Sequence, residues 1–168
     1  MSRKKAREIV LCLVFEKDYH KDLSCKKLFD EVIANGQLNE IYNSVDEPFE
    51  SFNVEDKKSI DKYNSSKKNI TLTENDLNYM EKVFFGVFEN IEQLDNLISE
   101  ASIGWEYNRI SKISMALLRM SVYEALYVDD VPVSVSINEA VELSKRYDHA
   151  EAYTFINGVL GTIVKNIK

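Results

Sequence analysis

The stretch MALLRMSVYE, residues 115–124, indicates most clearly how this 168-residue chain folds. It belongs to two consecutive helical patterns, over residues 110–115 and 116–127, that are rich in Leu, Met and Tyr. Pro132 marks their end, because proline disfavours helical backbone at the residue before it. These patterns predict helices whose apolar surfaces pack inside a core.

Apolar residues recur at helical spacing on both sides of this stretch. Thr73 is placed to cap one helix, and Asp76 at its third position gives a weakened capping box. The five Gly and two Pro are too few for a β-rich chain with many tight turns, and alternating strand patterns are essentially absent. We therefore predict an all-α fold. The other expected helices run from the N-terminus through Val14, over residues 24–34, 73–91 and 91–101, from Ser134 or Ser136 to about residue 147, and over residues 150–164.

Residues 37–71 break this pattern. Asn, Ser, Asp, Glu and Lys dominate the segment, Pro48 interrupts it, and its aromatic residues follow no clear period. We interpret it as a long polar insertion that contains one short helix near residues 54–63.

Four cations, Arg3, Lys4, Lys5 and Arg7, lie within the first seven residues, which contain no acid. The whole chain has a net charge of −7, and without these four it holds 17 basic against 28 acidic side chains. Cations are unfavourable at a helix N-terminus, whose dipole prefers anions, so these residues are expected to serve something other than helix stability. A basic tip on an acidic body suits an anionic partner that docks at one end. The alternative is a solvated, charged first turn.

Several classes of protein are excluded. No run of about 18 apolar residues is present, as a membrane span needs, and no signal-peptide cleavage site follows the basic start. Cys12 and Cys25 lack metal-ligand spacing and are interpreted as reduced thiols of a cytoplasmic protein. No phosphate-binding loop, metalloprotease or nucleophile-elbow motif is present. Glu139 and Glu142 have the spacing of an acid–base pair, but no nucleophile or metal ligand accompanies them. We expect no enzymatic activity, no cofactor and no metal.

Arg119 lies in an otherwise apolar helix and needs a partner, because an unpaired buried charge is costly. Glu124 and Glu139 are the candidates. The three residues are expected to form an ion pair between helices or, alternatively, part of a partner interface.

Four segments, in order, carry a resemblance to a known family: LRMSVYE from Leu118, DVP from Asp130, SINEAVELSK from Ser136 and FINGVL from Phe155. In this order and spacing they resemble the NusB family of bacterial transcription antitermination factors. The start RKKARE, from Arg3, resembles that family's arginine-rich motif. The resemblance covers both ends of the chain and the length between them, apart from residues 37–71.

The resemblance implies an all-helical fold of about seven helices in two packed bundles, near residues 1–101 and 102–168. It also implies transcription antitermination by binding of boxA-type RNA together with NusE, a ribosomal protein of the small subunit. The complex would act on RNA polymerase and support ribosomal RNA transcription.

The RNA-binding residues that the resemblance implies are Arg3, Lys4, Lys5, Arg7, Tyr147 and Phe155. Basic side chains bind phosphate, and unstacked bases need an aromatic ring to stack on. Phe155 lies about 100° off the apolar stripe of its helix, so we expect it to be partly exposed. Without the resemblance, ordinary core packing is the favoured interpretation of Phe155.

The chain departs from the family in the loop before the last helix. Asp148, Ala152 and Thr154 stand where the family carries Gly, a small hydroxyl residue and Lys. Loss of a cation and gain of an acid should weaken phosphate contact. The alternative function is therefore a non-catalytic protein-interaction or self-association module of the same fold, in which a homodimer shields the basic residues.

Overall fold

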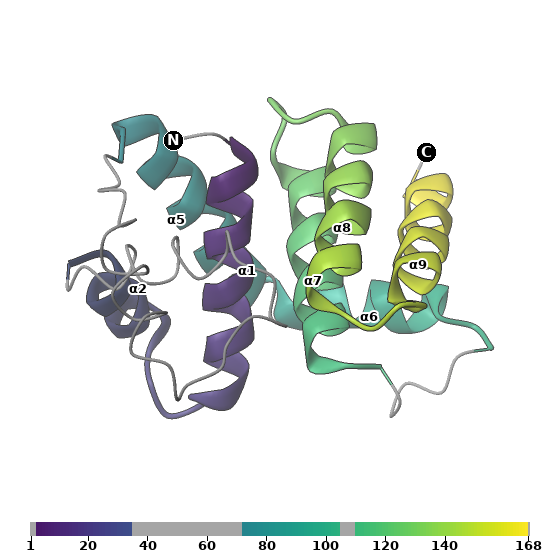
Figure 1. The fold of residues 1–168 in the computed structure, drawn as a ribbon, viewed down its shortest axis with the longest axis horizontal. Coiled ribbons are helices and arrows are strands. Elements are labelled where there is room, and N and C mark those ends of the chain that lie inside the picture. Colours follow the sequence, from purple (N-terminus) through teal and green to yellow (C-terminus); the bar gives the residue numbers. More distant parts are fainter. Residues whose placement is uncertain (1–2, 35–71, 105–109, 168) are drawn as a thin grey trace, which may run out of the picture.

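The computed structural model describes residues 3–34, 72–104 and 110–167, most of which are helical (Figure 1). No strand occurs within these ranges, which confirms the all-α prediction. The helices are α1 (Arg3–Tyr19), α2 (Cys25–Ala34), α5 (Glu74–Glu89), α6 (Ile91–Ala101), α7 (Lys112–Tyr127), α8 (Val133–Tyr147) and α9 (Ala152–Ile167). The short helix expected near residues 54–63 lies outside the described residues.

Two groups of helices meet along α1 and α7. In Figure 1, α1, α2 and α5 lie on one side and α7, α8 and α9 on the other, with α1 packed against α7. Helix α6 packs on α7 and α9 more than on α5. We therefore propose that the division between the two sub-bundles falls between α5 and α6, ahead of the expected position near residue 101.

Local sequence signals explain where α5 and α7 begin. The Thr73 side chain accepts a hydrogen bond from the Asp76 backbone, and the Asp76 carboxylate accepts one from the Thr73 backbone at 3.0 Å, so the capping box is complete. Helix α7 is one continuous element where the sequence suggested two, because no breaker separates residues 115 and 116. Ser111 caps it by accepting the Ser114 backbone N–H at 2.9 Å.

Helix α8 begins earlier than predicted. It starts at Val133 directly after Pro132, whose φ of −58° suits a helix start, and neither Ser134 nor Ser136 caps it. Ser136 instead points into the core, where its hydroxyl donates to Glu124 at 2.8 Å. The Ser136 hydroxyl therefore binds a buried acceptor on the preceding helix, α7, and does not cap α8.

The core is continuous across both sub-bundles. Its completely buried side chains include Leu13 on α1, Phe84 on α5 and Leu117 on α7. Gly86 permits the close approach of α5 and α7, because a Cβ there would overlap the ring of Tyr123. Within the described ranges, no helix has the length and apolar character needed to cross a membrane.

Candidate nucleic-acid interface

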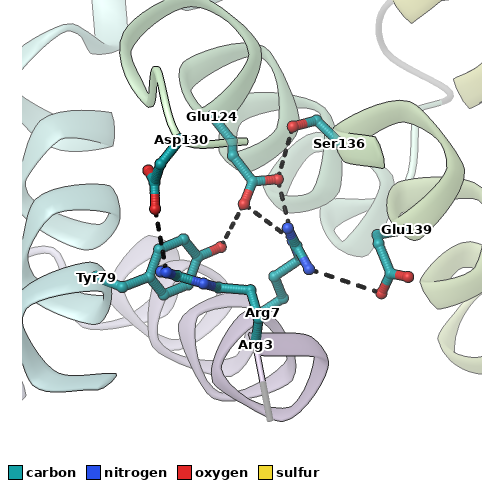
Figure 2. Close-up of polar contacts among 7 residues, drawn as sticks. All are labelled: Arg3, Arg7, Tyr79, Glu124, Asp130, Ser136 and Glu139. Carbon is teal, nitrogen blue, oxygen red and sulfur yellow. Dashed lines mark hydrogen bonds and ion pairs between the residues drawn. The ribbon is translucent and has the colours of Figure 1, made fainter. Parts of the chain in front are cut away.

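Arg7 points away from solvent into a buried network of polar side chains (Figure 2). Its side chain is 4% exposed, and its Nε lies 2.9 and 3.1 Å from the two carboxylate oxygens of Glu124. Glu124 also accepts hydrogen bonds from the Tyr79 hydroxyl at 2.7 Å and from the Ser136 hydroxyl at 2.8 Å. The network joins α1, α5, α7 and α8, so Arg7 holds the two sub-bundles together. In this structure Arg7 therefore has almost no surface to offer RNA, and the expected RNA contact stays a prediction.

The charges in this network stabilise one another. Burial opposes the charged guanidinium, but the hydrogen bond to Glu124 and the electrostatic interactions with Tyr79, Glu124 and Glu139 together outweigh burial and leave the pKa of Arg7 above its ordinary value. Burial, and then the charge of Glu124, strongly raise the pKa of the Tyr79 hydroxyl, which therefore stays protonated as a donor. Glu139, whose carboxylate oxygen lies 3.9 Å from Arg7, adds a longer ion pair.

Lys5 is also used internally. Its side chain is nearly buried, and its Nζ lies 3.1 Å from a carboxylate oxygen of the buried Glu8. Arg146 on α8 binds the other oxygen of Glu8 at 2.8 Å. Lys5 is therefore paired within α1, while the bond from Arg146 to Glu8 links α8 to α1. The expected RNA contact of Lys5 stays a prediction.

Arg3 and Lys4 are the members of the basic tip that reach the surface. Lys4 is exposed. The Arg3 side chain is 39% exposed, its guanidinium carbon lies 4.2 Å from the centroid of the Tyr79 ring, and it forms a 3.2 Å ion pair with Asp130 (Figure 2). The basic tip therefore presents two cations to a partner, where the sequence suggested four.

Arg119 is paired, but with neither expected acid. Its NH1 lies 3.0 and 2.8 Å from the carboxylate of Asp18, and its Nε and NH2 lie 2.7 and 2.8 Å from that of Asp95. It ties α7 to the end of α1 and to α6. Glu124 lies on another side of α7 and faces Arg7, as does Glu139 on α8, so the expected pairing was wrong.

Tyr147, at the end of α8, borders an apolar groove of about 480 Å³ between α1, α7 and α8. Its ring lies 5.3 Å from the guanidinium carbon of Arg146. Phe15 and the exposed Tyr19 contribute further aromatic surface to this groove. The residues lining it are Leu11, Cys12, Phe15, Glu16, Tyr19, His20, Ile113 and Tyr147.

The sequence matches the model of the NusB family over residues 38–165. It is 32% identical to the transcription antitermination protein NusB of Clostridium acetobutylicum over 166 residues, which cover 99% of this chain and 97% of that protein. The chain belongs to the NusB family. NusB of Acetivibrio thermocellus is 47% identical over 102 residues, which cover 61% of this chain and 70% of that protein.

Solved NusB structures share the fold. NusB of T. maritima superposes with a TM-score of 0.65 and 26% identity, over 98% of this chain and 92% of that one. A chain from a complex of antitermination factors NusB and NusE with dsRNA has a TM-score of 0.68 and 20% identity, over 98% and 96% of the two chains. These likenesses confirm the predicted NusB-like architecture.

Phe155 is only 6% exposed and belongs to the core, so its expected exposure is wrong. On α9 the buried residues include Ala152, Phe155, Ile156, Val159 and Leu160. This spacing forms an apolar stripe wide enough to include Phe155. The sequence interpretation drew that stripe too narrowly, and the ring is not available to a base in this conformation.

Asp148, one of the departures from the NusB family, also turns inward. Its side chain is 3% exposed and accepts hydrogen bonds from the hydroxyls of Ser111 and Ser114 and from the backbone of His149. The carboxylate therefore ties the end of α8 to the start of α7. It does not face a bound phosphate, as the sequence comparison had assumed.

Sequence reasoning missed a second set of polar residues beside the basic tip. Asn75, Asn78 and Lys82 are exposed on α5 and line a polar pocket that also contains Arg3. Their spacing of three and four residues places them on one helical face. That spacing was visible in the sequence, but its position next to Arg3 depends on the tertiary structure. Among the described residues, no group of three His, Cys, Asp or Glu side chains is placed to hold a metal ion.

Proposed function

We propose that this chain is a non-catalytic cytoplasmic transcription antitermination factor that binds boxA-type RNA together with NusE. The observation that carries the proposal is the similarity to the antitermination protein of C. acetobutylicum over nearly the full length of both chains. NusE is part of the proposal because this chain shares its fold with a chain from the complex of antitermination factors NusB and NusE with dsRNA. The assembly acts on RNA polymerase and supports ribosomal RNA transcription.

The charge distribution supports RNA binding at the start of α1. Arg3 and Lys4 are the accessible cations there, in a chain whose net charge is −7. Cations bind phosphate with release of counterions, and each contact contributes roughly 0.7 to the slope of log affinity against log salt for single strands. Since Lys5 and Arg7 are paired internally, the tip is expected to contribute about two such contacts.

The aromatic groove supports a continuation of the RNA site along α1 toward Tyr147. Arg146 lies beside the Tyr147 ring and keeps part of its surface exposed. An aromatic ring next to a cation suits an unstacked base and its phosphate.

Self-association is the second candidate, and the same groove favours it. Tyr19 is 63% exposed at the edge of the groove, beside the apolar surface of Phe15 and Ile113. A second copy that covered this groove would compete with RNA for the surface between α1 and α8. Sedimentation of the full chain with and without RNA tests this alternative. A dimer that dissociates when RNA is added would show that self-association and RNA binding compete for the same surface.

The direct test is fluorescence anisotropy of a labelled boxA-type RNA, with and without NusE, across a salt series. We expect Lys4→Ala to weaken binding and to reduce the salt slope by roughly 0.7. Lys27→Ala, which removes an exposed lysine from α2, is the matched control and should bind as the wild type does. An equal effect of the two variants would remove the α1 tip from the RNA site, and an absence of RNA binding by the wild type would reject the function.

A further inference from the structure

A polar pocket of about 320 Å³ lies beside the basic tip, at the start of α5 and the turn after α7. Its size is at the lower end of the range for small-ligand sites. The buried Arg7 network does not use most of its walls, and the amides of Asn75 and Asn78 are exposed. The lining residues are Arg3, Asn75, Asn78, Tyr79, Lys82, Val128 and Asp130.

One wall of the pocket is formed by Arg3 stacked on Tyr79. The guanidinium carbon lies 4.2 Å from the ring centroid. The ring itself is buried, and its hydroxyl is anchored to Glu124 at 2.7 Å (Figure 2). Guanidinium planes stack on nucleic-acid bases as well as on aromatic rings, so Arg3 offers a preorganised platform at the pocket wall.

Three other lining residues, all on α5, are suited to the remaining parts of a nucleotide. Asn75 and Asn78 lie one turn apart on α5 and each offers both amide donors and a carbonyl acceptor. Lys82 lies one turn further along the same face and supplies a point charge for phosphate. The pocket therefore combines a stacking platform, two amides that match base edges, and a cation.

We propose that this pocket binds one unpaired nucleotide of the RNA, with its base on Arg3, its edge against Asn75 and Asn78, and its phosphate near Lys82. This inference rests on the proposed RNA-binding function and extends the RNA site from the α1 tip onto α5. Asp130 weakens the site, because its carboxylate repels phosphate and holds Arg3 in an exposed ion pair, 66% of the acid side chain being accessible. Exposed pairs of this kind are easily exchanged for another anion.

The test uses the full chain, a single-stranded boxA-type RNA and fluorescence anisotropy at fixed salt. We expect Asn78→Ala to weaken binding by about fivefold, as loss of one good base-edge contact does. Lys82→Ala should weaken binding and lower the salt slope by roughly 0.7. Asn96→Ala on α6 and Lys27→Ala on α2 remove the same side chains from exposed sites elsewhere and should change neither quantity.

Asp130→Asn gives an effect of opposite sign. The amide keeps an oxygen acceptor for Arg3 and removes the negative charge, so we expect RNA to bind about threefold more tightly. A purely structural role of Asp130 would leave affinity unchanged or lower it. Urea unfolding of each variant checks that the fold is intact.

The outcomes separate this inference from the proposed function. If the wild type binds RNA but the Asn78, Lys82 and Asp130 variants behave as the controls do, the pocket assignment is overturned and RNA binding stands. If the wild type binds no RNA with or without NusE, both proposals fail. Weaker binding by Asn78→Ala and Lys82→Ala, with tighter binding by Asp130→Asn, supports the site.

Discussion

The Nε–H of Arg7 is shared between both carboxylate oxygens of Glu124, at 2.9 and 3.1 Å, and neither side chain is more than 4% exposed. The two residues are 117 positions apart in the chain. A cation in an apparent RNA-binding motif is therefore the partner of a buried acid in the opposite sub-bundle. Within the basic tip, Arg7 therefore stabilises the fold, whereas Arg3 and Lys4 remain accessible to a partner.

Arg7→Ala is expected to destabilise the protein by about 3–5 kcal/mol, because the Glu124 charge is left buried without its cation. Urea unfolding followed by circular dichroism measures the change. Arg3→Ala, which breaks the exposed pair with Asp130, should cost less than about 1 kcal/mol. Adding Glu124→Gln to Arg7→Ala should restore part of the loss by removing the stranded charge. Similar stabilities of Arg7→Ala and Arg3→Ala would contradict the buried network.

Arg119→Ala is expected to cost about 2 kcal/mol, between the values for exposed and buried pairs. Both Asp18 and Asp95 lose their shared partner, and these acids are themselves partly shielded. A double-mutant cycle with Asp95→Asn should show coupling of about 1 kcal/mol or more. A cycle with Glu124→Gln should show none, and coupling in that second cycle would restore the partner expected from the sequence.

Phe155→Ala is expected to destabilise the protein by about 3–5 kcal/mol, as removal of a buried aromatic ring does. Tyr153→Ala on the same helix is the comparison, because that ring is 41% exposed, and its cost should stay below about 1 kcal/mol. Thermal or urea unfolding measures both. A stable Phe155→Ala variant with weakened RNA binding would return the ring to the RNA surface.

Asp148 is expected to make stability fall at acidic pH. Burial alone would raise its pKa, but hydrogen bonds from Ser114, His149 and Ser111 outweigh burial and lower it. Because the pKa of Asp148 is lower in the folded than in the unfolded state, its stabilisation is complete above the ordinary pKa of an aspartate, about 4. The stabilisation is lost as the pH falls through the pKa of the folded state. Urea midpoints over this pH range should therefore depend less on pH in Asp148→Asn. The exposed Asp129→Asn serves as control, and an equal acid slope in both variants would exclude this role.

The helices were predictable because their signals are local. Apolar spacing located α2, α5 and α6 closely, and Thr73 with Asp76 identified the start of α5. The pairing of charges was not predictable, because Arg7 and Arg119 find their acids on other helices, at separations of 117 residues for Glu124, 101 for Asp18 and 24 for Asp95. One clue was available: Arg7 lies three residues before Val10 and seven before Val14, both completely buried, so helical spacing already placed it on the core-facing side.

The exposure of the candidate RNA-binding residues was harder to predict because it depends on neighbouring helices. The resemblance favoured an exposed Phe155 and an RNA-facing Asp148, yet both side chains are covered by packing against other helices. Tyr147 and Lys4 keep accessible surface. A family pattern indicates which positions matter for function. Burial then decides whether the side chain at such a position can contact a ligand or instead holds another residue in place.

The Glu124 network has a consequence for how the protein unfolds. Its four helices come from both sub-bundles, so opening either one exposes a charge whose partner stays buried in the other. That penalty disfavours half-folded states and makes the two sub-bundles melt as one cooperative unit, for which calorimetric and van't Hoff enthalpies should agree. The start of α1, where we propose that RNA binds, is thus held in place by residues from the other end of the chain, and we expect it to unfold only with the whole molecule.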